Sequence, residues 1–141
     1  MKKLTYLFLS IILVGTTFIS SCKKSDSTAI NYSQINFKSG SGYISSSQSI
    51  QIASSLLFGI NASGGDFSLK RFLVLHTYKT KVIIVKDTAF NIASFSYDIQ
   101  ASALPIPDTD TWIFKIFNSN GDSLAVSLII TTTNPPPAGP I

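Results

Sequence analysis

Residues able to do acid–base or nucleophilic chemistry are few in this 141-residue chain. It has one histidine, His76, one cysteine, Cys22, and seven acidic residues, all aspartates. A Ser-His-Asp arrangement needs a base beside an activated serine, but no G-x-S-x-G turn surrounds any serine, and His76 lies within an apolar run. We therefore expect His76 to be an ordinary strand residue, and we predict no catalytic residue and no enzymatic activity.

The segment "PDTD" brings two carboxylates close together in the sequence. Such a pair performs glycoside hydrolysis when its surroundings separate the two pKa values, yet prolines flank this segment and favour a solvated turn. Hard oxygen ligands here and in the later turn "NSNGD" suit calcium, and the weak candidates are Asp108, Asp110, Asn118, Asn120 and Asp122. Because Asn and Asp are common in turns and a single His and Cys exclude zinc, we predict no metal site and no cofactor.

Aromatic side chains are the other candidates, since exposed rings stack on sugar faces. Trp112 is the only tryptophan, and it begins an alternating stripe with Phe114 and Ile116 that favours core packing. Phe117 faces away from that stripe. Phe117 and Tyr43 are the better candidates for exposed rings.

The N-terminus has the pattern of an export signal. Lys2 and Lys3 precede an uncharged apolar stretch that ends in small and polar residues before Cys22. The alternative is a retained membrane helix over residues 4–21, whose length is close to the minimum for a span. Several Ser and Thr residues and Gly15 make that stretch a poor span, so we favour a cleaved signal.

The sequence "ISSC", residues 19–22, resembles the lipobox of bacterial lipoproteins, with Ile19 in place of the commoner leucine. The resemblance implies that residues 1–21 are a lipoprotein signal peptide and that Cys22 is lipidated and holds the protein to a membrane. Lys23 follows the cysteine, where lipoproteins kept in the inner membrane tend to have aspartate. The resemblance therefore implies an outer-membrane lipoprotein, on its periplasmic or its surface-exposed face.

Charge gives no sign of a nucleic-acid partner. Removing residues 1–21 removes Lys2 and Lys3, so the eleven basic residues fall to nine against seven aspartates. Nucleic-acid binding needs an extended Lys/Arg face, which this balance does not supply. We predict no nucleic-acid binding.

Composition divides the exported chain into three parts. Residues 22–34 are polar and read as a flexible tether, and residues 134–141 form a proline-rich C-terminal tail. Between them, residues 35–133 have the size of one ordinary domain, roughly 100 residues.

Within that domain the apolar residues alternate with period two, which indicates β-strands. The pattern is clear in residues 56–62 and 93–101, and in residues 112–117 and 124–130, which flank the turn "NSNGD" and predict a hairpin. Residues 69–78 and 81–85 are apolar on both faces around a short turn at Lys79 and Thr80. No stripe of helical period and no internal repeat is present.

About seven short strands predict an all-β fold, a single antiparallel β-sandwich, with a small barrel as the alternative. The segments "SLLFGINASGG", "LKRFLVLHTYKTKVIIV" and "TWIFKIFNSNGDSLAVSLIITT" resemble those of Ig-like and PKD-like domains of bacterial surface lipoproteins. That resemblance implies an Ig-like sandwich over residues 35–133.

These observations predict a lipid-anchored, non-enzymatic Ig-like module of the cell envelope that serves as a spacer or a protein-interaction domain. We expect a monomer attached to the membrane through Cys22, with a protein or glycan partner in the envelope. The alternative is a carbohydrate-binding accessory lipoprotein of a polysaccharide-uptake system. The sequence does not identify the ligand.

Overall fold

The computed structural model describes residues 29–137, which fold into β-strands without helices. The predicted signal peptide, Cys22 and most of the predicted tether lie outside the described residues. None of residues 29–137 forms a helix able to cross a membrane. The strands are β1 (Gln34–Phe37), β2 (Gln48–Gln51), β3 (Ser55–Ser63), β4 (Leu69–Tyr78), β5 (Lys81–Ile92), β6 (Ser94–Ser102), β7 (Thr109–Asn118) and β8 (Ser123–Thr133).

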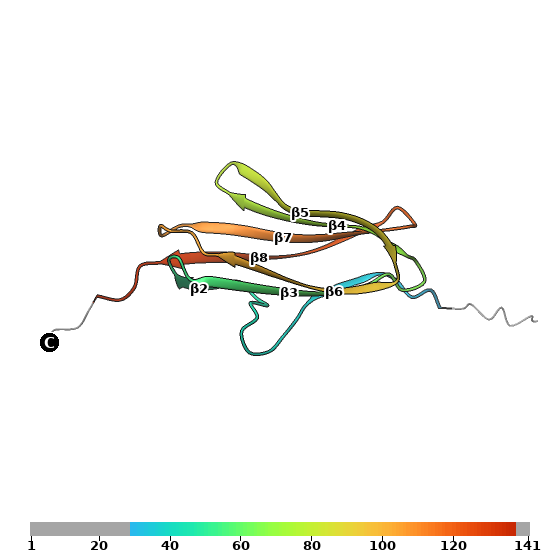
Figure 1. Ribbon diagram of the computed structural model, residues 1–141, viewed down its shortest axis with the longest axis horizontal. Coiled ribbons are helices and arrows are strands. Elements are labelled where there is room, and N and C mark those ends of the chain that lie inside the picture. Colours follow the sequence, from blue (N-terminus) through green and yellow to red (C-terminus); the bar gives the residue numbers. More distant parts are fainter. Residues whose placement is uncertain (1–28, 138–141) are drawn as a thin grey trace, which may run out of the picture.

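The strands form two layers that run along the long axis of the molecule (Figure 1). One sheet has the order β1-β3-β6 and the other β2-β8-β7-β4-β5. This order can be written in the strand letters of an Ig-like sandwich, with β3, β4, β6, β7 and β8 as strands B, C, E, F and G. In these letters β5 takes the C′ position beside C. The predicted all-β sandwich is confirmed, with eight strands instead of about seven.

One pairing departs from the antiparallel expectation. The short strand β2 pairs in parallel with β8, from Gln48 opposite Ile130 to Gln51 opposite Thr133. The loop between β1 and β2 allows this, because it carries the chain from the three-stranded sheet to the five-stranded sheet. Sequence periodicity marks a strand but not its direction relative to a partner.

The core lies between the sheets and follows the predicted alternation. Every second residue of β3 is buried, as are the Trp112, Phe114 and Ile116 positions of β7. The rings of Phe58 and Trp112 lie with centroids 4.8 Å apart, so the two sheets meet through aromatic contacts. Trp112 is 3% exposed, which confirms its predicted place in the core.

The predicted hairpin at the end of the domain is also confirmed. Strands β7 and β8 pair antiparallel from Phe117 opposite Ser123 onward, and Gly121 in their turn has a φ of 89°. The Asn118 side-chain oxygen accepts hydrogen bonds from the backbone N–H groups of Asn120 and Asp122. The side chain of Asn118 thus provides an acceptor for backbone N–H groups of the turn, which is a common role of Asn in turns.

Strand β5 is longer than the apolar run that predicted it. It continues through residues 86–92 and leads, after Ala93, directly into β6 of the other sheet. Both are edge strands, β5 of the five-stranded sheet and β6 of the three-stranded sheet. The side of the sandwich between β5 and β6 is therefore not closed by a further strand among the described residues.

Candidate functional site

The five weak candidates for calcium ligands fall at opposite ends of β7. Asp108 and Asp110 lie at its start, whereas Asn118, Asn120 and Asp122 lie at its end and in the following turn. Asn118 lies eight positions after Asp110 along the extended strand, a span of roughly 26 Å. The structure does not bring the two groups together. Within residues 29–137, no cluster of three or more His, Cys, Asp or Glu side chains is arranged to bind a metal.

The sequence context of Asp110 predicted a solvated turn, and this prediction is wrong. Asp110 is the second residue of β7, its side chain faces the interior, and the residue is 2% exposed. Its Oδ2 lies 2.6 Å from Nε2 of His76 on β4. In the strand register His76 lies opposite Trp112, which is two residues after Asp110 on β7. Sequence reasoning missed the contact of His76 with Asp110 because the two residues meet only through the register of β4 against β7.

The His76 ring is enclosed on a second side by Trp112. The two rings are stacked, with centroids 4.4 Å apart and planes 21° from parallel. Nucleophilic catalysis needs a hydroxyl or thiol hydrogen-bonded to the base, and no such group among the described residues contacts His76. Asp110 Oδ1 and Trp112 Nε1 are buried without a hydrogen-bond partner in the described part of the chain. The cluster of His76, Asp110 and Trp112 is thus a buried polar contact inside the sandwich.

Asp108 remains at the surface beside this cluster. It accepts hydrogen bonds from the backbone N–H of Thr109 and from the Tyr78 hydroxyl, and the Lys79 ammonium lies 3.8 Å away. The Thr109 N–H, followed by the Tyr78 hydroxyl, lowers the pKa of Asp108 below its ordinary value. Asp108 therefore ties the start of β7 to the end of β4 as a carboxylate.

The two rings that the sequence marked as exposed are both engaged. Tyr43 lies over Gly59, where an added Cβ would come within 2.6 Å of the tyrosine ring, and its hydroxyl donates to Asp98. Phe117 lies on the outer face of the five-stranded sheet, 5.5 Å from the Arg71 guanidinium and 4.9 Å from the Lys115 ammonium. Phe117 is half-buried.

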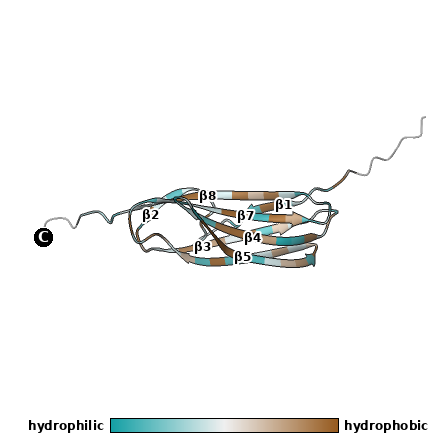
Figure 2. Cartoon of the chain, turned by 90° about the horizontal axis from the view of Figure 1, so that it is seen from above, coloured by the Kyte–Doolittle hydropathy of each residue, from teal (hydrophilic) through white to brown (hydrophobic). Residues whose placement is uncertain are grey.

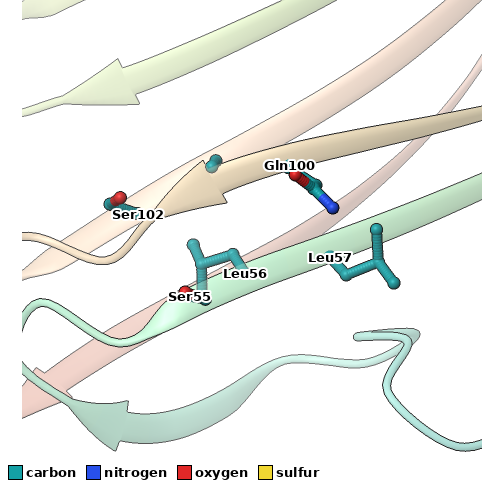
Figure 3. A pocket seen from close by; sticks show the side chains of 6 residues that line it. Ser55, Leu56, Leu57, Gln100 and Ser102 are labelled. Atoms are coloured by element: carbon teal, nitrogen blue, oxygen red, sulfur yellow. The ribbon is translucent and has the colours of Figure 1, made fainter.

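A shallow groove of about 320 Å³ lies along β3 and β6 (Figure 3). Ser55 and Leu57 line it from β3, and their register partners Ser102 and Gln100 line it from β6. These side chains offer hydroxyl and amide groups and one apolar surface, with no titratable group among the lining residues. The groove can form hydrogen bonds to a polar ligand, but it has no acid or base.

The most exposed apolar segment of the described chain lies on the edge strand β5. Val82, Ile83, Ile84 and Val85, here called the aliphatic edge segment, are each between 41% and 61% exposed. Lys81 and Lys86 flank it. Figure 2 shows β8, β7, β4 and β5 side by side in one sheet, with β5 at its border.

The outer face of that sheet extends the apolar surface inward from the edge. In the strand register, Ile84 lies beside Leu75 of β4, which lies beside Ile113 of β7. Leu75 and Ile113 are only half-buried. A partner that contacted Ile84 could therefore also contact two further aliphatic side chains.

No family model matches the sequence, and a search of curated proteins finds no match. Two solved structures match part of this chain, each with a TM-score of 0.43 over 74% of it. One is Spo0M, a sporulation control protein from Bacillus subtilis, at 6% identity and with 51% of its chain covered. The other is a beta-glucosidase from Listeria innocua, at 8% identity and with 17% of its chain covered.

Proposed function

We propose that the protein is a lipid-anchored, non-enzymatic module of the cell envelope and that its sandwich is a protein-interaction domain. The observation that carries this proposal is the aliphatic edge segment on β5. An edge strand presents unpaired backbone N–H and C=O groups, which an extended segment of another protein can pair with as an added strand.

Flanking residues limit uncontrolled pairing at this edge. Lys81 and Lys86 border the segment, and Val85 is an extra residue in the register of β5 against β4, because Val74 pairs with Lys86 and Leu75 with Ile84. Charges and bulges are the usual protection of exposed edges against aggregation. Four consecutive exposed aliphatic residues between the two lysines support a specific partner, since contiguous apolar surface marks interaction sites.

The aliphatic edge segment lies far from the N-terminal end of the sandwich. Asn31 donates its backbone N–H to Asp66 in the β3–β4 turn. Strand β4 then runs ten residues, roughly 33 Å, to the β4–β5 turn at the opposite end of the molecule (Figure 1). A lipid anchor before residue 29 would attach at the Asn31 end and leave the β4–β5 turn free to reach a partner.

The chemistry of the interior supports a non-enzymatic role. His76 is held between Asp110 and Trp112, and its ring nitrogen is within 2.6 Å of the carboxylate. General acid–base catalysis needs a group that reaches a substrate proton within hydrogen-bonding distance. The groove of Figure 3 has no titratable side chain to do this.

The anchor is tested by the variant Cys22→Ala. We expect it to abolish metabolic palmitate labelling and detergent partitioning, because Cys22 is the only cysteine of the chain. Ser21→Ala is the matched control, since a small residue is retained before the cysteine. Persistent labelling of the Cys22→Ala protein would contradict the lipoprotein assignment.

The interaction role is tested with a photo-crosslinking amino acid at position 83 of the full-length protein in the cells that produce it. We expect a discrete crosslink to an envelope protein from position 83. Asn61 is the control position, because it is exposed on the other sheet and away from β5. Equal labelling from positions 83 and 61, or no crosslink from position 83, would contradict the interaction role and leave a spacer role.

A second candidate function is the carbohydrate-binding accessory lipoprotein of a polysaccharide-uptake system. The groove of Figure 3 favours it, because hydroxyl and amide groups of Ser55, Gln100 and Ser102 could bond sugar hydroxyls. Titration of the protein with oligosaccharides measures this directly. Saturable binding that Gln100→Ala abolishes would support it, and the absence of any heat of binding would contradict it.

A further inference from the structure

The open side of the sandwich, between the edge strands β5 and β6, contains an apolar cavity of about 200 Å³. Its lining includes the aromatic rings of Phe72, Phe90, Phe95 and Tyr97. Phe95 contacts both Phe72 and Phe90, with ring centroids 4.9 and 5.3 Å away, and Tyr97 lies 5.7 Å from Phe72. The rings thus contact one another and form one continuous aromatic wall of the cavity.

A lysine and a threonine from β5 share this side of the strand. Lys86 pairs with the buried residue Val74 and Thr88 with Phe72, so both face inward and both line the cavity. The Lys86 ammonium lies 5.6 Å from the Tyr97 ring centroid. The open mouth therefore has a cation and a hydroxyl beside an apolar wall.

No acidic side chain of residues 29–137 forms a salt bridge with Lys86. The nearest aspartate in sequence, Asp87, points to the opposite face of β5, because successive strand residues alternate. Arg71 holds Asp87 there through two hydrogen bonds of 2.7 and 2.6 Å. The positive charge of Lys86 at the cavity mouth is thus not neutralised by the fold.

We propose that this cavity is a binding site for a small aromatic carboxylate, with the ring inside and the carboxylate at Lys86. A cavity of about 150 Å³ is sufficient to hold benzene, so a space of about 200 Å³ accommodates one substituted ring. The four aromatic side chains offer edge-to-face contacts to that ring. The Lys86 ammonium supplies a charge-assisted hydrogen bond to the carboxylate, and Thr88, which also lines the cavity, has a hydroxyl that can donate a second bond.

This site is independent of the proposed interaction role. The aliphatic edge segment ends at Val85, and its outward residues Val82 and Ile84 lie on the face opposite Lys86 and Thr88. The titration described below uses the purified protein without a partner, so it measures binding in the cavity separately from the interaction role. Either proposal can fail without the other.

The test is calorimetric and NMR titration of the full-length, detergent-solubilised protein with 3-phenylpropionate. We expect saturable binding with a Kd on the order of 1 mM, as a ligand of this size allows. Lys86→Met keeps the aliphatic stem and removes the charge, and we expect it to weaken binding at least tenfold. Thr88→Phe should abolish binding by filling the cavity.

Lys81→Met is the matched control, since Lys81 lies on the same face of β5 but does not line the cavity. We expect it to leave the Kd unchanged. Equal weakening by Lys86→Met and Lys81→Met would show attraction to surface charge only and would overturn the site. Failure to saturate at 10 mM, on the order of ten times the expected Kd, would also overturn it. Equal affinity for the uncharged 3-phenylpropanamide would overturn the role of Lys86.

Discussion

Strands β5 and β7 have similar apolar sequences and opposite environments. In "TWIFKIFN" of β7, every second residue from Trp112 onward is buried, whereas in "KVIIV" of β5 all five residues are exposed. The difference follows from position in the sheet. Strand β7 lies between β4 and β8, whereas β5 pairs with β4 alone.

This comparison separates residues that stabilise the fold from residues free to serve another role. Burying apolar surface stabilises a protein by roughly 25 cal/mol per Å², which an exposed aliphatic side chain does not contribute. An exposed apolar edge also carries a risk of aggregation. Substitutions in β7 should therefore reduce stability, and substitutions in the aliphatic edge segment should reduce binding.

The largest expected effect is at the core position Trp112. Trp112→Ala should lower the free energy of unfolding by about 3–5 kcal/mol, because it removes a buried ring that packs against the rings of Phe58 and His76. Chemical denaturation monitored by circular dichroism measures this loss. Trp112→Phe is the control and should lose less, since the indole N–H has no partner among the described residues. A loss below about 1 kcal/mol for Trp112→Ala would contradict the core role.

The next effect concerns the buried pair of β4 and β7. His76→Leu should lower the free energy of unfolding by about 3 kcal/mol, because Asp110 would remain buried without its partner. Replacing both residues by leucine should recover much of that loss, since no buried carboxylate remains. A double-mutant cycle in urea measures the coupling. Additive losses from the two single variants would contradict a direct His76–Asp110 interaction.

The sequence predicts the elements whose two faces differ. Strands β3, β6, β7 and β8 alternate clearly, and Asn120 and Gly121 mark the turn of the last hairpin. The short strands β1 and β2 have four residues each, too few for a period-two pattern to stand out. Residues 86–92 of β5 are mixed in polarity and extend the strand only because β4 provides a partner. The local residue pattern does not indicate the pairing of β5 with β4.

The candidate sites depend on contacts between residues far apart in the chain, which the sequence does not show. His76 and Asp110 are 34 residues apart and meet only through strand register. The prolines before Asp110 favoured a turn, but pairing with β8 draws Asp110 into β7. The aromatic cavity likewise needs Phe72, Phe90 and Phe95 from three strands. Sequence alone identified the apolar run of β5 but not which of its faces is open.

A smaller effect is expected at a surface contact of the other sheet. Asp98 accepts hydrogen bonds from the Lys38 ammonium at 2.5 Å and the Tyr43 hydroxyl at 3.0 Å, which hold the β1–β2 loop over β3. The hydrogen bond from Lys38, helped by that from Tyr43, lowers the pKa of Asp98. Its stabilisation is therefore present above the unfolded pKa of about 3.9 and is lost as pH falls through the folded pKa.

The corresponding measurement is the melting temperature between pH 6 and pH 2. We expect it to fall by a few degrees at the acid end, and Asp98→Asn should reduce the size of that fall while lowering stability at pH 6. Asp66→Asn is a control on a different loop. An unchanged acid dependence in Asp98→Asn would contradict the role of this carboxylate.

The smallest effect on stability is expected at Ile84, in the aliphatic edge segment, where it sharpens the comparison most. Ile84→Asp should change the free energy of unfolding by no more than about 0.5 kcal/mol, because this side chain is 60% exposed and is not part of the hydrophobic core. The same variant should abolish the crosslink from position 83, because a carboxylate placed against an apolar partner surface would be buried without a partner charge. Ile116→Asp, at a fully buried position of β7, is the opposite case and should prevent folding. If Ile84→Asp destabilised the fold by several kcal/mol, or folded normally and kept the crosslink, the division between a stabilising β7 and a binding β5 would be wrong.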